Sequence, residues 1–382
     1  MRVLFLTGWY PNKFDVQNGI FVRKHAMAVS RYCEVNLLYI TRDKTLNKGY
    51  VIRRQTTDNF TEWTVYYKGS RFLLLHIYLT VMLYRKMIAS IRRVKGVEDL
   101  IHINVLGKKD AIIALMQWWQ NKIPYILTEH WTGYMNERFR QKNFIEKLIL
   151  RHAAKKAKAI TTVSEELKNA MLQCGLRNNY FVIPNVVESV PDVPVREKDK
   201  NVKVFLTVSD LADENKNISG TIHAVSRIAA KRNDFEFHII GGGADEEALK
   251  KLATDLNLIN KRVFFHGRHT NDVVLNLMNR ADFVVVNSNV ETFSVVAAEA
   301  LASGKPVIAT ICGGPETFIN DATGILIEKR NNTQLETAIL KMLDTFQNYK
   351  KAVLRASVIE KFGSETIGKT FYELYKLSTN TN

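Results

Sequence analysis

Cysteine is scarce in this chain of 382 residues. The three cysteines, Cys33, Cys174 and Cys312, are scattered and odd in number. Such a set predicts neither a disulfide framework nor a zinc site, and it is typical of a reducing compartment. The first residues, MRVLFLTGWYPN, do not fit a signal peptide, because their apolar run is short, has only one basic residue ahead of it and lacks a small-residue cleavage site. We therefore expect a cytoplasmic protein.

Long apolar runs are also missing. The longest nearly apolar stretch is FLLLHIYLTVMLY, residues 72–84. It is shorter than the roughly 20 residues that a membrane-spanning helix needs. Basic residues flank it, among them Arg71, Arg85 and Lys86. Two interpretations stay open: an amphipathic segment lying peripherally on an anionic membrane at its inner face, or a core helix of the first domain.

Two common fingerprints of ligand sites are absent. The triple glycine at residues 241–243 follows a strand-like run, but it is not Gly-x-Gly-x-x-Gly. The acids behind it, Asp245 and Glu246, suit the start of a helix but would repel a phosphate. A nicotinamide dinucleotide is therefore not expected. Asp-x-Asp occurs nowhere in the chain, so that acidic pair is not available to hold a divalent ion.

Acidic residues are few in the first half only. The net charge is +16, and residues 1–190 contain 30 Lys and Arg against 14 Asp and Glu, whereas residues 191–382 contain 24 of each. A one-sided basic domain attracts an anion, which leaves nucleic acid, acidic lipid and a phosphorylated substrate as candidates. A merely soluble basic surface is the alternative.

Strand-like and helix-like segments alternate along the chain. RVLFLT, EVNLLYI, DLIHIN and PYILTEH alternate with helical patterns, and the alternation restarts at KVFLTVS after a proline-bearing, charged linker at residues 188–200. Such a pattern predicts parallel sheets covered by helices. We predict an α/β protein with two doubly wound Rossmann-like domains, residues 1–187 and 188–361, that face each other across a cleft.

The last segment, residues 362–382, is helical in pattern. Phe371, Leu374, Tyr375 and Leu377 are predicted to cluster on one side of it. A closing surface helix is the simplest interpretation.

Three residues at the ends of strand-like runs are candidates for ligand binding. Gly19 ends a long loop and would start a helix whose first N–H groups lack partners. His130 ends the run PYILTEH, and Lys216 follows VFLTVS, where a cation could face a phosphate. A structural histidine and a solvent-facing lysine are the alternatives.

The stretch ETFSVVAAEA, residues 291–300, places two carboxylates eight positions apart. Glu291 precedes a helix that we expect to begin near Ser294 or Val295. A diphosphate fits that positive end, and Glu291 could accept hydrogen bonds from the hydroxyls of a sugar beside it. Glu299 lies further into the helix, on an apolar face, where a ribose diol would satisfy its carboxylate. A capping acid and an unrelated helix acid are the alternative.

The motifs together resemble glycosyltransferase family 4, the retaining nucleotide-sugar transferases of the two-domain GT-B fold. The Glu-x7-Glu pair is the most specific mark, and NGIFVRKHA, ITTVSEELK, VIPNVV, EALASGKPVIAT and GGPETFI also match. The resemblance spans nearly the whole chain. It further implies that the terminal helix, residues 362–382, crosses back to the first domain.

The resemblance implies a role for each candidate residue. Glu291 would hold the hydroxyls of the donor sugar, and Glu299 the ribose. His130 would contact the transferred sugar near the reacting carbon. The remaining donor-binding positions are Gly19 near the phosphate, Ser209, Lys216 on the diphosphate, Arg268 on the base through its main chain, and the backbone N–H groups of Phe293, Ser294 and Val295.

Two positions depart from the family pattern. Ser209-Asp210 stands where the family often has Gly-Arg, so the arginine that partners the diphosphate is missing. Ser294 stands in place of the usual glycine and allows a less free backbone approach. Both departures bear on how the diphosphate is held, and Lys216 or Lys305 would carry more of that task.

The resemblance implies transfer of a hexose-type sugar from a UDP- or GDP-sugar to a glycan or lipid-linked glycan acceptor. Without Asp-x-Asp, we expect no metal and no cofactor, and Lys216 with a helix dipole would stabilise the leaving group. No nucleic acid partner is expected. The competing hypotheses are a nucleotide-sugar epimerase or hydrolase of the same fold, and an inactive sugar-nucleotide sensor.

Overall fold

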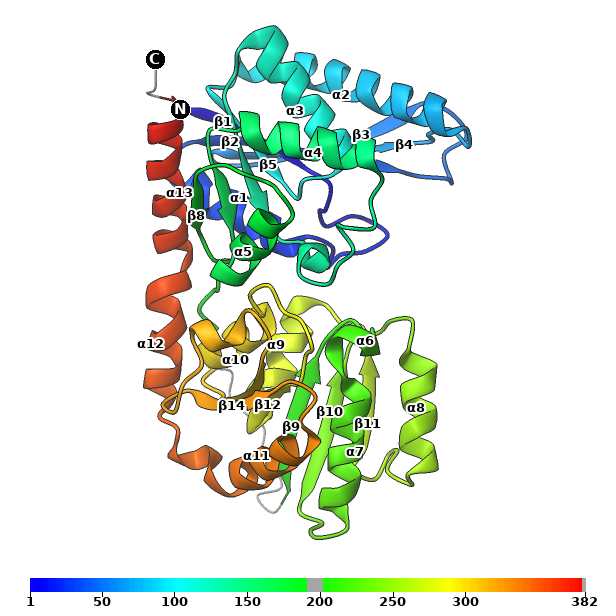
Figure 1. The fold of residues 1–382 in the computed structure, drawn as a ribbon, viewed down its shortest axis with the longest axis vertical. Coiled ribbons are helices and arrows are strands. Elements are labelled where there is room, and N and C mark those ends of the chain that lie inside the picture. Colours follow the sequence, from blue (N-terminus) through cyan, green and yellow to red (C-terminus); the bar gives the residue numbers. More distant parts are fainter. Residues whose placement is uncertain (191–201, 380–382) are drawn as a thin grey trace. The chain divides into compact units, whose positions relative to one another are not determined.

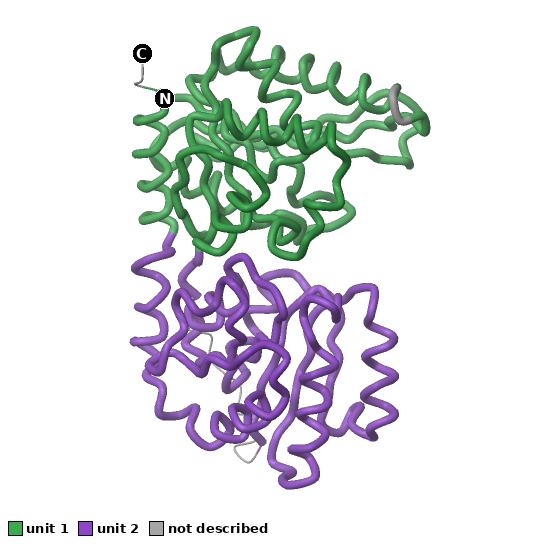
Figure 2. The backbone as a smooth tube through the Cα atoms, in the orientation of Figure 1, with its two compact units in different colours: residues 1–186, 364–382 green, residues 187–363 purple. Residues whose placement is uncertain are grey.

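The computed structural model describes residues 1–190 and 202–379. The chain forms two compact units, one of residues 1–186 with 364–382 and one of residues 187–363 (Figure 2). The expected boundaries stood at 187/188 and 361/362. Most of the expected linker lies outside the described residues.

The first unit contains an eight-stranded sheet in the order β3-β4-β2-β1-β5-β6-β7-β8 (Figure 1). All neighbouring strands are parallel except β3 and β4, which form an antiparallel pair. Its elements are β1 (Arg2–Thr7), α1 (Ile20–Ser30), β2 (Glu34–Arg42), β3 (Tyr50–Thr57), β4 (Phe60–Tyr67), α2 (Leu73–Lys95), β5 (Leu100–Asn104), α3 (Lys108–Asn121), β6 (Tyr125–Glu129), η1 (Thr132–Tyr134), α4 (Phe144–Lys156), β7 (Ile160–Thr162), α5 (Glu165–Gln173), β8 (Tyr180–Val182) and α13 (Ser364–Thr379).

The second unit contains a six-stranded, wholly parallel sheet in the order β11-β10-β9-β12-β13-β14. Both sheets confirm the predicted pair of doubly wound α/β domains. The elements are β9 (Lys203–Val208), α6 (Asp213–Lys216), α7 (Ile218–Ala229), β10 (Phe235–Ile240), α8 (Glu246–Asp255), β11 (Val263–Gly267), α9 (Asn271–Arg280), β12 (Phe283–Val286), α10 (Val295–Ala302), β13 (Val307–Ile311), η2 (Pro315–Thr317), β14 (Gly324–Glu328), α11 (Asn332–Thr345), η3 (Phe346–Asn348) and α12 (Lys351–Phe362).

Stacked phenylalanines form the centre of the second unit. The ring of Phe205 on β9 stacks on Phe237 and on Phe283, each with ring centroids 4.9 Å apart. All three side chains are fully buried. Because they come from three adjacent strands, the stack holds β10, β9 and β12 together on one face of the sheet.

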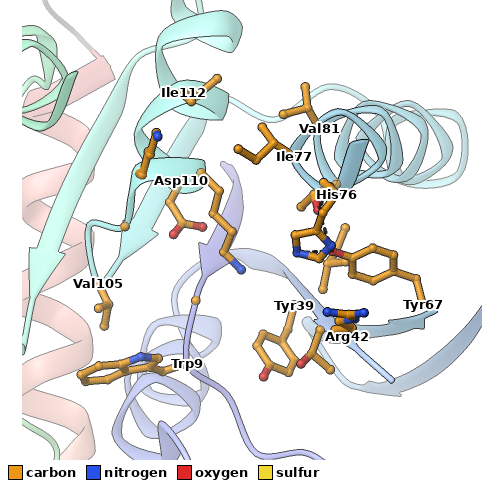
Figure 3. A pocket seen from close by; sticks show the side chains of 17 residues that line it. Trp9, Tyr39, Arg42, Tyr67, His76, Ile77, Val81, Val105, Asp110 and Ile112 are labelled. Atoms are coloured by element: carbon orange, nitrogen blue, oxygen red, sulfur yellow. Dashed lines mark hydrogen bonds between the residues drawn. The ribbon is translucent and has the colours of Figure 1, made fainter. Parts of the chain in front are cut away.

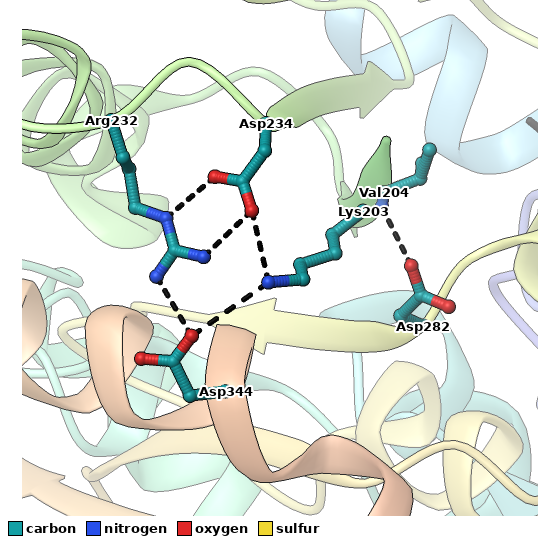
Figure 4. Close-up of polar contacts among 6 residues, drawn as sticks. All are labelled: Lys203, Val204, Arg232, Asp234, Asp282 and Asp344. Atoms are coloured by element: carbon teal, nitrogen blue, oxygen red, sulfur yellow. Dashed lines mark hydrogen bonds and ion pairs between the residues drawn. The ribbon is translucent and has the colours of Figure 1, made fainter. Parts of the chain in front are cut away.

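Ion pairs tie the amino-terminal ends of β9 and β10 to each other and to α11 (Figure 4). The guanidinium of Arg232 donates to both oxygens of Asp234, at 2.7 and 2.8 Å, and to Asp344 at 3.0 Å. Lys203 also donates to Asp234, at 2.9 Å. The Arg232 hydrogen bond holds the pKa of Asp234 well below its usual range. Doubly wound sheets bind ligands at the carboxyl ends of their strands, whereas this network lies at the amino-terminal ends. We therefore expect it to stabilise the fold rather than to bind a ligand.

The terminal helical segment divides at Gly363 into α12 and α13. Helix α13 packs on α1 within the first unit, where a Cβ added at Gly368 would lie only 2.3 Å from the carbonyl oxygen of Ala28. Phe371, Leu374 and Tyr375 share the buried side of the helix, in agreement with their predicted clustering, but Leu377 is 66% exposed. Including Leu377 in this cluster was wrong, because it lies on the solvent side of the helix.

Helix α2 carries the apolar stretch 72–84. Within the described ranges, 1–190 and 202–379, the helices are either too short or too polar to cross a bilayer. The inner face of α2 is buried, whereas its N-cap Phe72 and the side chains of Leu75, Tyr78 and Met82 are exposed. The helix is therefore amphipathic rather than wholly part of the core.

Candidate functional site

The strand order of the second unit reverses between β9 and β12. From β9 the chain proceeds to β10 and β11 on one side, whereas β12, β13 and β14 lie on the other. Loops that leave the carboxyl ends of the two strands diverge there and leave room for a ligand. The connection after β9 contains the short helix α6, whose last residue is Lys216, and the loop after β12 carries Glu291.

Lys216 and Glu291 meet at this point. The ammonium of Lys216 donates to Glu291 Oε1 at 2.7 Å, and the Ser288 hydroxyl donates to the same oxygen, also at 2.7 Å. The two charged side chains are 21% and 13% exposed. Burial lowers the pKa of Lys216, but the carboxylate of Glu291, with a smaller contribution from Asp210, outweighs that effect and raises it. Lys216 is therefore held as a cation.

Asp210 stands at the edge of this pair. Its carboxylate lies 4.0 Å from the ammonium of Lys216 and is 64% exposed. The position that the family often gives to an arginine is thus an acid that faces the cation. It adds negative charge where a diphosphate would bind.

Helix α10 begins beside the pair, at Val295 with Ser294 as its N-cap, which confirms the predicted start. Ser294 has φ 68°, in the left-handed region that favours glycine. Its hydroxyl is buried and finds no hydrogen-bond partner among the described residues. The first-turn N–H groups of a helix carry positive potential, so this end suits an anion.

Phe293 anchors the loop before α10. Its buried ring packs against Phe318 and Phe362, at 5.4 and 5.1 Å between centroids. A Cβ added at Gly314 would lie 2.7 Å from the backbone of Phe293, so the loops after β12 and β13 touch. Because the side chain points into the core, only the main chain of Phe293 is available to a ligand.

Glu299 lies in the second turn of α10. Its side chain is buried, on a helix that otherwise consists of Val, Ala and Leu. The position agrees with the expected apolar helix face. A carboxylate at such a place is costly unless hydrogen bonds satisfy it.

Ser209 and Arg268 meet at the triple glycine, next to the same strand edge. The guanidinium of Arg268 donates to the carbonyl oxygen of Gly242 at 3.0 and 3.2 Å. A Cβ added at Gly241 would lie 1.8 Å from the carbonyl oxygen of Ser209, so only glycine fits there. The Ser209 hydroxyl is buried and has no partner among the residues that the structure describes.

His130 follows β6 in the first unit. It is buried against Phe21 and His25, with ring centroids 4.4 and 5.5 Å apart. Burial, together with the nearby His25 and His102, lowers the pKa of His130 well below its ordinary value. The imidazole is therefore neutral and can act only through hydrogen bonds.

Glu129 orders the backbone around His130. Its buried carboxylate accepts the N–H groups of His130, Trp131 and Leu106, at 2.8, 3.0 and 3.0 Å. Burial raises the pKa of Glu129, and these hydrogen bonds oppose the rise. This role of Glu129 was not predicted from the sequence, although a glutamate at the end of an apolar strand was a usable signal.

Gly19 caps α1 with φ 63°. A Cβ added there would lie 2.4 Å from the carbonyl oxygen of Trp9, so the fold of the loop after β1 by itself requires glycine. The next turn carries Phe21, which contacts His130. The first unit thus brings Gly19 and His130 to one region.

The structure therefore groups the predicted residues as follows. In the second unit, Lys216, Glu291, Phe293, Ser294 and Val295 lie around the β9–β12 reversal, with Glu299 on the same helix, and Ser209 and Arg268 lie at the neighbouring triple glycine. Gly19 and His130 belong to the first unit. Ser288 was missed, although it stands only three positions before Glu291.

Two families of known proteins match this chain. The family described as Glycosyl transferases group 1 matches residues 189–356, and the family described as Glycosyltransferase Family 4 matches residues 33–189. An uncharacterized glycosyltransferase of Methanocaldococcus jannaschii is 32% identical over 250 residues, which are 64% of this chain and 66% of that protein. The chain spans less than two thirds of the length of the curated relatives it matches.

Solved structures share the fold across the whole chain. A sucrose-phosphate synthase from Thermosynechococcus elongatus superposes with a TM-score of 0.80 at 20% identity, covering 99% of each chain. The HepE protein of Anabaena, solved in complex with UDP, superposes with a TM-score of 0.72 at 19% identity, covering 99% of this chain and 100% of that one. At these identities the likeness concerns the fold.

Proposed function

Because the chain belongs to the glycosyltransferases of the family 4 type, we propose that it transfers a sugar from a nucleoside-diphosphate sugar to a glycan or lipid-linked glycan acceptor, with retention of the anomeric configuration. A UDP- or GDP-sugar is the proposed donor. The UDP bound to the HepE protein, which has the same fold, supports a nucleotide donor. The alternatives, an epimerase or hydrolase and an inactive sensor, draw no support from a specific feature.

The observation that carries the proposal is the Lys216–Glu291 pair beside the start of α10. An ammonium has three N–H donors, so Lys216 can keep Glu291 and still contact a phosphate oxygen. The α10 N-terminus supplies main-chain donors and a positive dipole to the same oxygens. Both stabilise the negative charge that grows on the diphosphate as the glycosidic bond breaks.

The two serines that depart from the family pattern fit the same task. The hydroxyls of Ser209 and Ser294 are buried and lack partners among the described residues. A buried hydroxyl without a partner costs free energy that a ligand can recover. We assign both hydroxyls to oxygens of the donor, in place of the absent arginine.

The two carboxylates, Glu291 and Glu299, are assigned to hydrogen bonds with the transferred sugar and with the ribose of the donor. Glu291 retains a second oxygen for donor hydroxyls while Oε1 is held by Lys216 and Ser288. Glu299, one turn into α10, is assigned to the ribose. The neutral His130 is assigned to the transferred sugar, where it would donate or accept a hydrogen bond and would not act as an acid.

The leaving phosphate is proposed to take the proton of the acceptor hydroxyl on the same face of the sugar. No cofactor and no metal ion enters this scheme, since Lys216 and α10 balance the diphosphate charge. Turnover in excess chelator should match turnover without it. A strict need for magnesium or manganese would contradict the scheme.

The experiment for the proposed function is proton NMR of the anomeric region during turnover of a nucleotide sugar with an acceptor panel. Formation of a new glycoside with the donor's configuration is expected. Inversion would refute retention. Free sugar or epimer formed at the same rate without acceptor would favour the hydrolase or epimerase, and donor binding without any turnover would favour the sensor.

We also propose that the first unit attaches peripherally to an anionic membrane, at the inner face. Phe72, Leu75 and Met82 are exposed on one face of α2, and Lys86 and Arg93 lie exposed on the same side. Apolar burial at the lipid interface and about 1 kcal/mol per basic residue would act together, the latter fading with salt.

Liposome co-sedimentation tests the membrane proposal. Wild-type protein should bind anionic vesicles at low salt and release with added salt. Replacing Leu75 and Met82 by Ser should weaken binding severalfold, whereas the matched change Leu148→Ser, at an exposed site on α4, should not. No binding to anionic vesicles at low salt would remove the proposal and favour a soluble acceptor.

A further inference from the structure

A cavity of about 540 Å³ lies within the first unit, and none of the residues that line it is assigned to the donor (Figure 3). It opens at the carboxyl ends of β1, β2, β4 and β5, where the strand order of this sheet reverses between β1 and β5. The inner face of α2 and the start of α3 complete its walls. Parallel sheets place ligands at this kind of reversal.

Asp110 is the one acid among the residues that line the cavity. Its side chain is buried, and its Oδ1 atom has no hydrogen-bond partner among the described residues. Two glycines leave space for it, since an added Cβ at Gly107 or Gly8 would lie 2.7 or 3.4 Å from Oδ2. Burial raises the pKa of Asp110 to about 6. A buried carboxyl oxygen of this kind is ready to accept a hydrogen bond from a ligand hydroxyl.

Cationic groups outnumber this acid around the cavity. Arg42, Lys108 and Lys109 line it, together with His76. Figure 3 places Arg42 beside His76 on one side of the cavity and Asp110 on the other. Burial lowers the pKa of His76, and the charges of Arg42 and Lys109 lower it further, so the field here is positive. In the part of the chain that the structure describes, Lys109 forms no ion pair with a carboxylate.

Apolar side chains form the remaining wall. Ile77 and Val81 from α2 and Ile112 from α3 face the cavity (Figure 3). The same helix α2 presents Leu75 and Met82 to the outside. One helix therefore lines the cavity on its inner face and exposes an apolar surface on its outer face.

We propose that this cavity holds the acceptor, and that the acceptor is a phosphate-bearing amphiphile. Arg42 and Lys109 bind the phosphate, Asp110 accepts a hydrogen bond from a hydroxyl of the acceptor other than the one that reacts, and the apolar wall receives the first carbons of the chain. This inference rests on the proposed transferase function, which it makes specific in the class of acceptor. It is independent of which nucleotide the donor carries.

Binding of three probes tests the inference: octyl phosphate, octyl glucoside and inorganic phosphate. Titration would be followed on the His76 ring by NMR of full-length protein. Octyl phosphate should bind at least tenfold more tightly than either other probe and should raise the pKa of His76, because a nearby anion favours the charged ring. Arg42→Gln should weaken octyl phosphate about tenfold, and the matched surface change Arg31→Gln should leave it unchanged.

Each contrary result overturns a stated part of the inference. Equal binding of octyl glucoside would refute recognition of phosphate, and equal binding of inorganic phosphate would refute the amphiphile. Octyl phosphate binding that is the same in Arg42→Gln would refute the cavity as its site. Binding of UDP and of GDP, measured on the same samples, separates the two claims. Either nucleotide bound without octyl phosphate refutes this inference alone, whereas binding of neither nucleotide and no octyl phosphate refutes the proposed function as well.

Discussion

Replacing Glu291 by Gln should both destabilise the fold and slow turnover. The variant keeps the size of the side chain but removes the charge that faces Lys216 at 2.7 Å. At an effective dielectric constant of about 20, unit charges at that separation attract by roughly 6 kcal/mol. Most of that attraction offsets the hydration that both groups lose, because they are only 21% and 13% exposed. We expect the free energy of unfolding to fall by about 2 kcal/mol, the amount typical of losing a hydrogen bond between charged groups.

A double-mutant cycle isolates the interaction energy between Lys216 and Glu291 from the other effects of each substitution. Lys216→Met should cost a similar amount, since it leaves Glu291 without its cation. The double variant should lose clearly less than the sum of the two, with a coupling energy of about 1–3 kcal/mol. Urea unfolding at pH 7 measures the stabilities, and nucleoside diphosphate release measures turnover. Additive losses would refute the coupled pair, and full turnover in Glu291→Gln would refute its role at the donor sugar.

Three further predictions concern other groups. Asp210→Asn removes a negative charge 4.0 Å from Lys216, so it should tighten donor binding severalfold. Calorimetry measures this affinity, and the exposed control Asp255→Asn should leave it unchanged. Weaker binding by Asp210→Asn would argue against a diphosphate beside Lys216. Ser294→Gly relieves the strain of a serine in the left-handed region, so the free energy of unfolding should rise by about 1 kcal/mol. Donor affinity should fall, because the hydroxyl assigned to an oxygen of the donor is lost. A less stable variant would contradict the backbone argument. Burial lowers the pKa of His25 to about 4. The neutral ring therefore contributes fully to the free energy of unfolding above pH 6.5, and this contribution, about 3 kcal/mol in total, is lost as the pH falls toward 4. Urea unfolding of His25→Leu should show a correspondingly weaker loss of stability between pH 7 and pH 4, and an unchanged pH dependence would contradict this.

Periodicity was sufficient to predict the two parallel sheets, because their strands are buried on both faces and read as short apolar runs. The antiparallel pair β3–β4 was missed. Strand β3, YVIRRQTT, is exposed along its whole length at the sheet edge, so it has no apolar alternation to detect. The short β8 lacked a signal for a similar reason, since none of its three residues is fully buried.

The meeting of Lys216 with Glu291 was only partly predictable. Sequence order placed both residues after strands of one sheet, and the strand reversal that joins their loops appears only in the topology. The ion pair itself was not expected, because the two residues had been assigned to different parts of a ligand. The acid at Asp210 was visible in the sequence, but its 4.0 Å approach to the ammonium was not.

The cavity of the first unit was beyond sequence reasoning altogether. Arg42, His76 and Asp110 come from three separated segments and match no motif. Only the basic excess of residues 1–190 pointed toward an anionic partner. A positive field that arises from residues far apart in the sequence can be detected in the net charge, but these residues form no motif with a fixed spacing.

Binding of nucleotide sugars to the second unit tests the central claim most directly. A panel of UDP-, GDP- and ADP-sugars would be screened by thermal shift with wild type, Glu299→Gln and the exposed control Glu328→Gln. At one hundred times its dissociation constant a ligand of the native state adds about 2.7 kcal/mol. We predict that one nucleotide class raises the melting temperature of wild type and of the control but not of Glu299→Gln. No shift with any nucleotide sugar, or an undiminished shift in Glu299→Gln, would contradict the donor site described for α10.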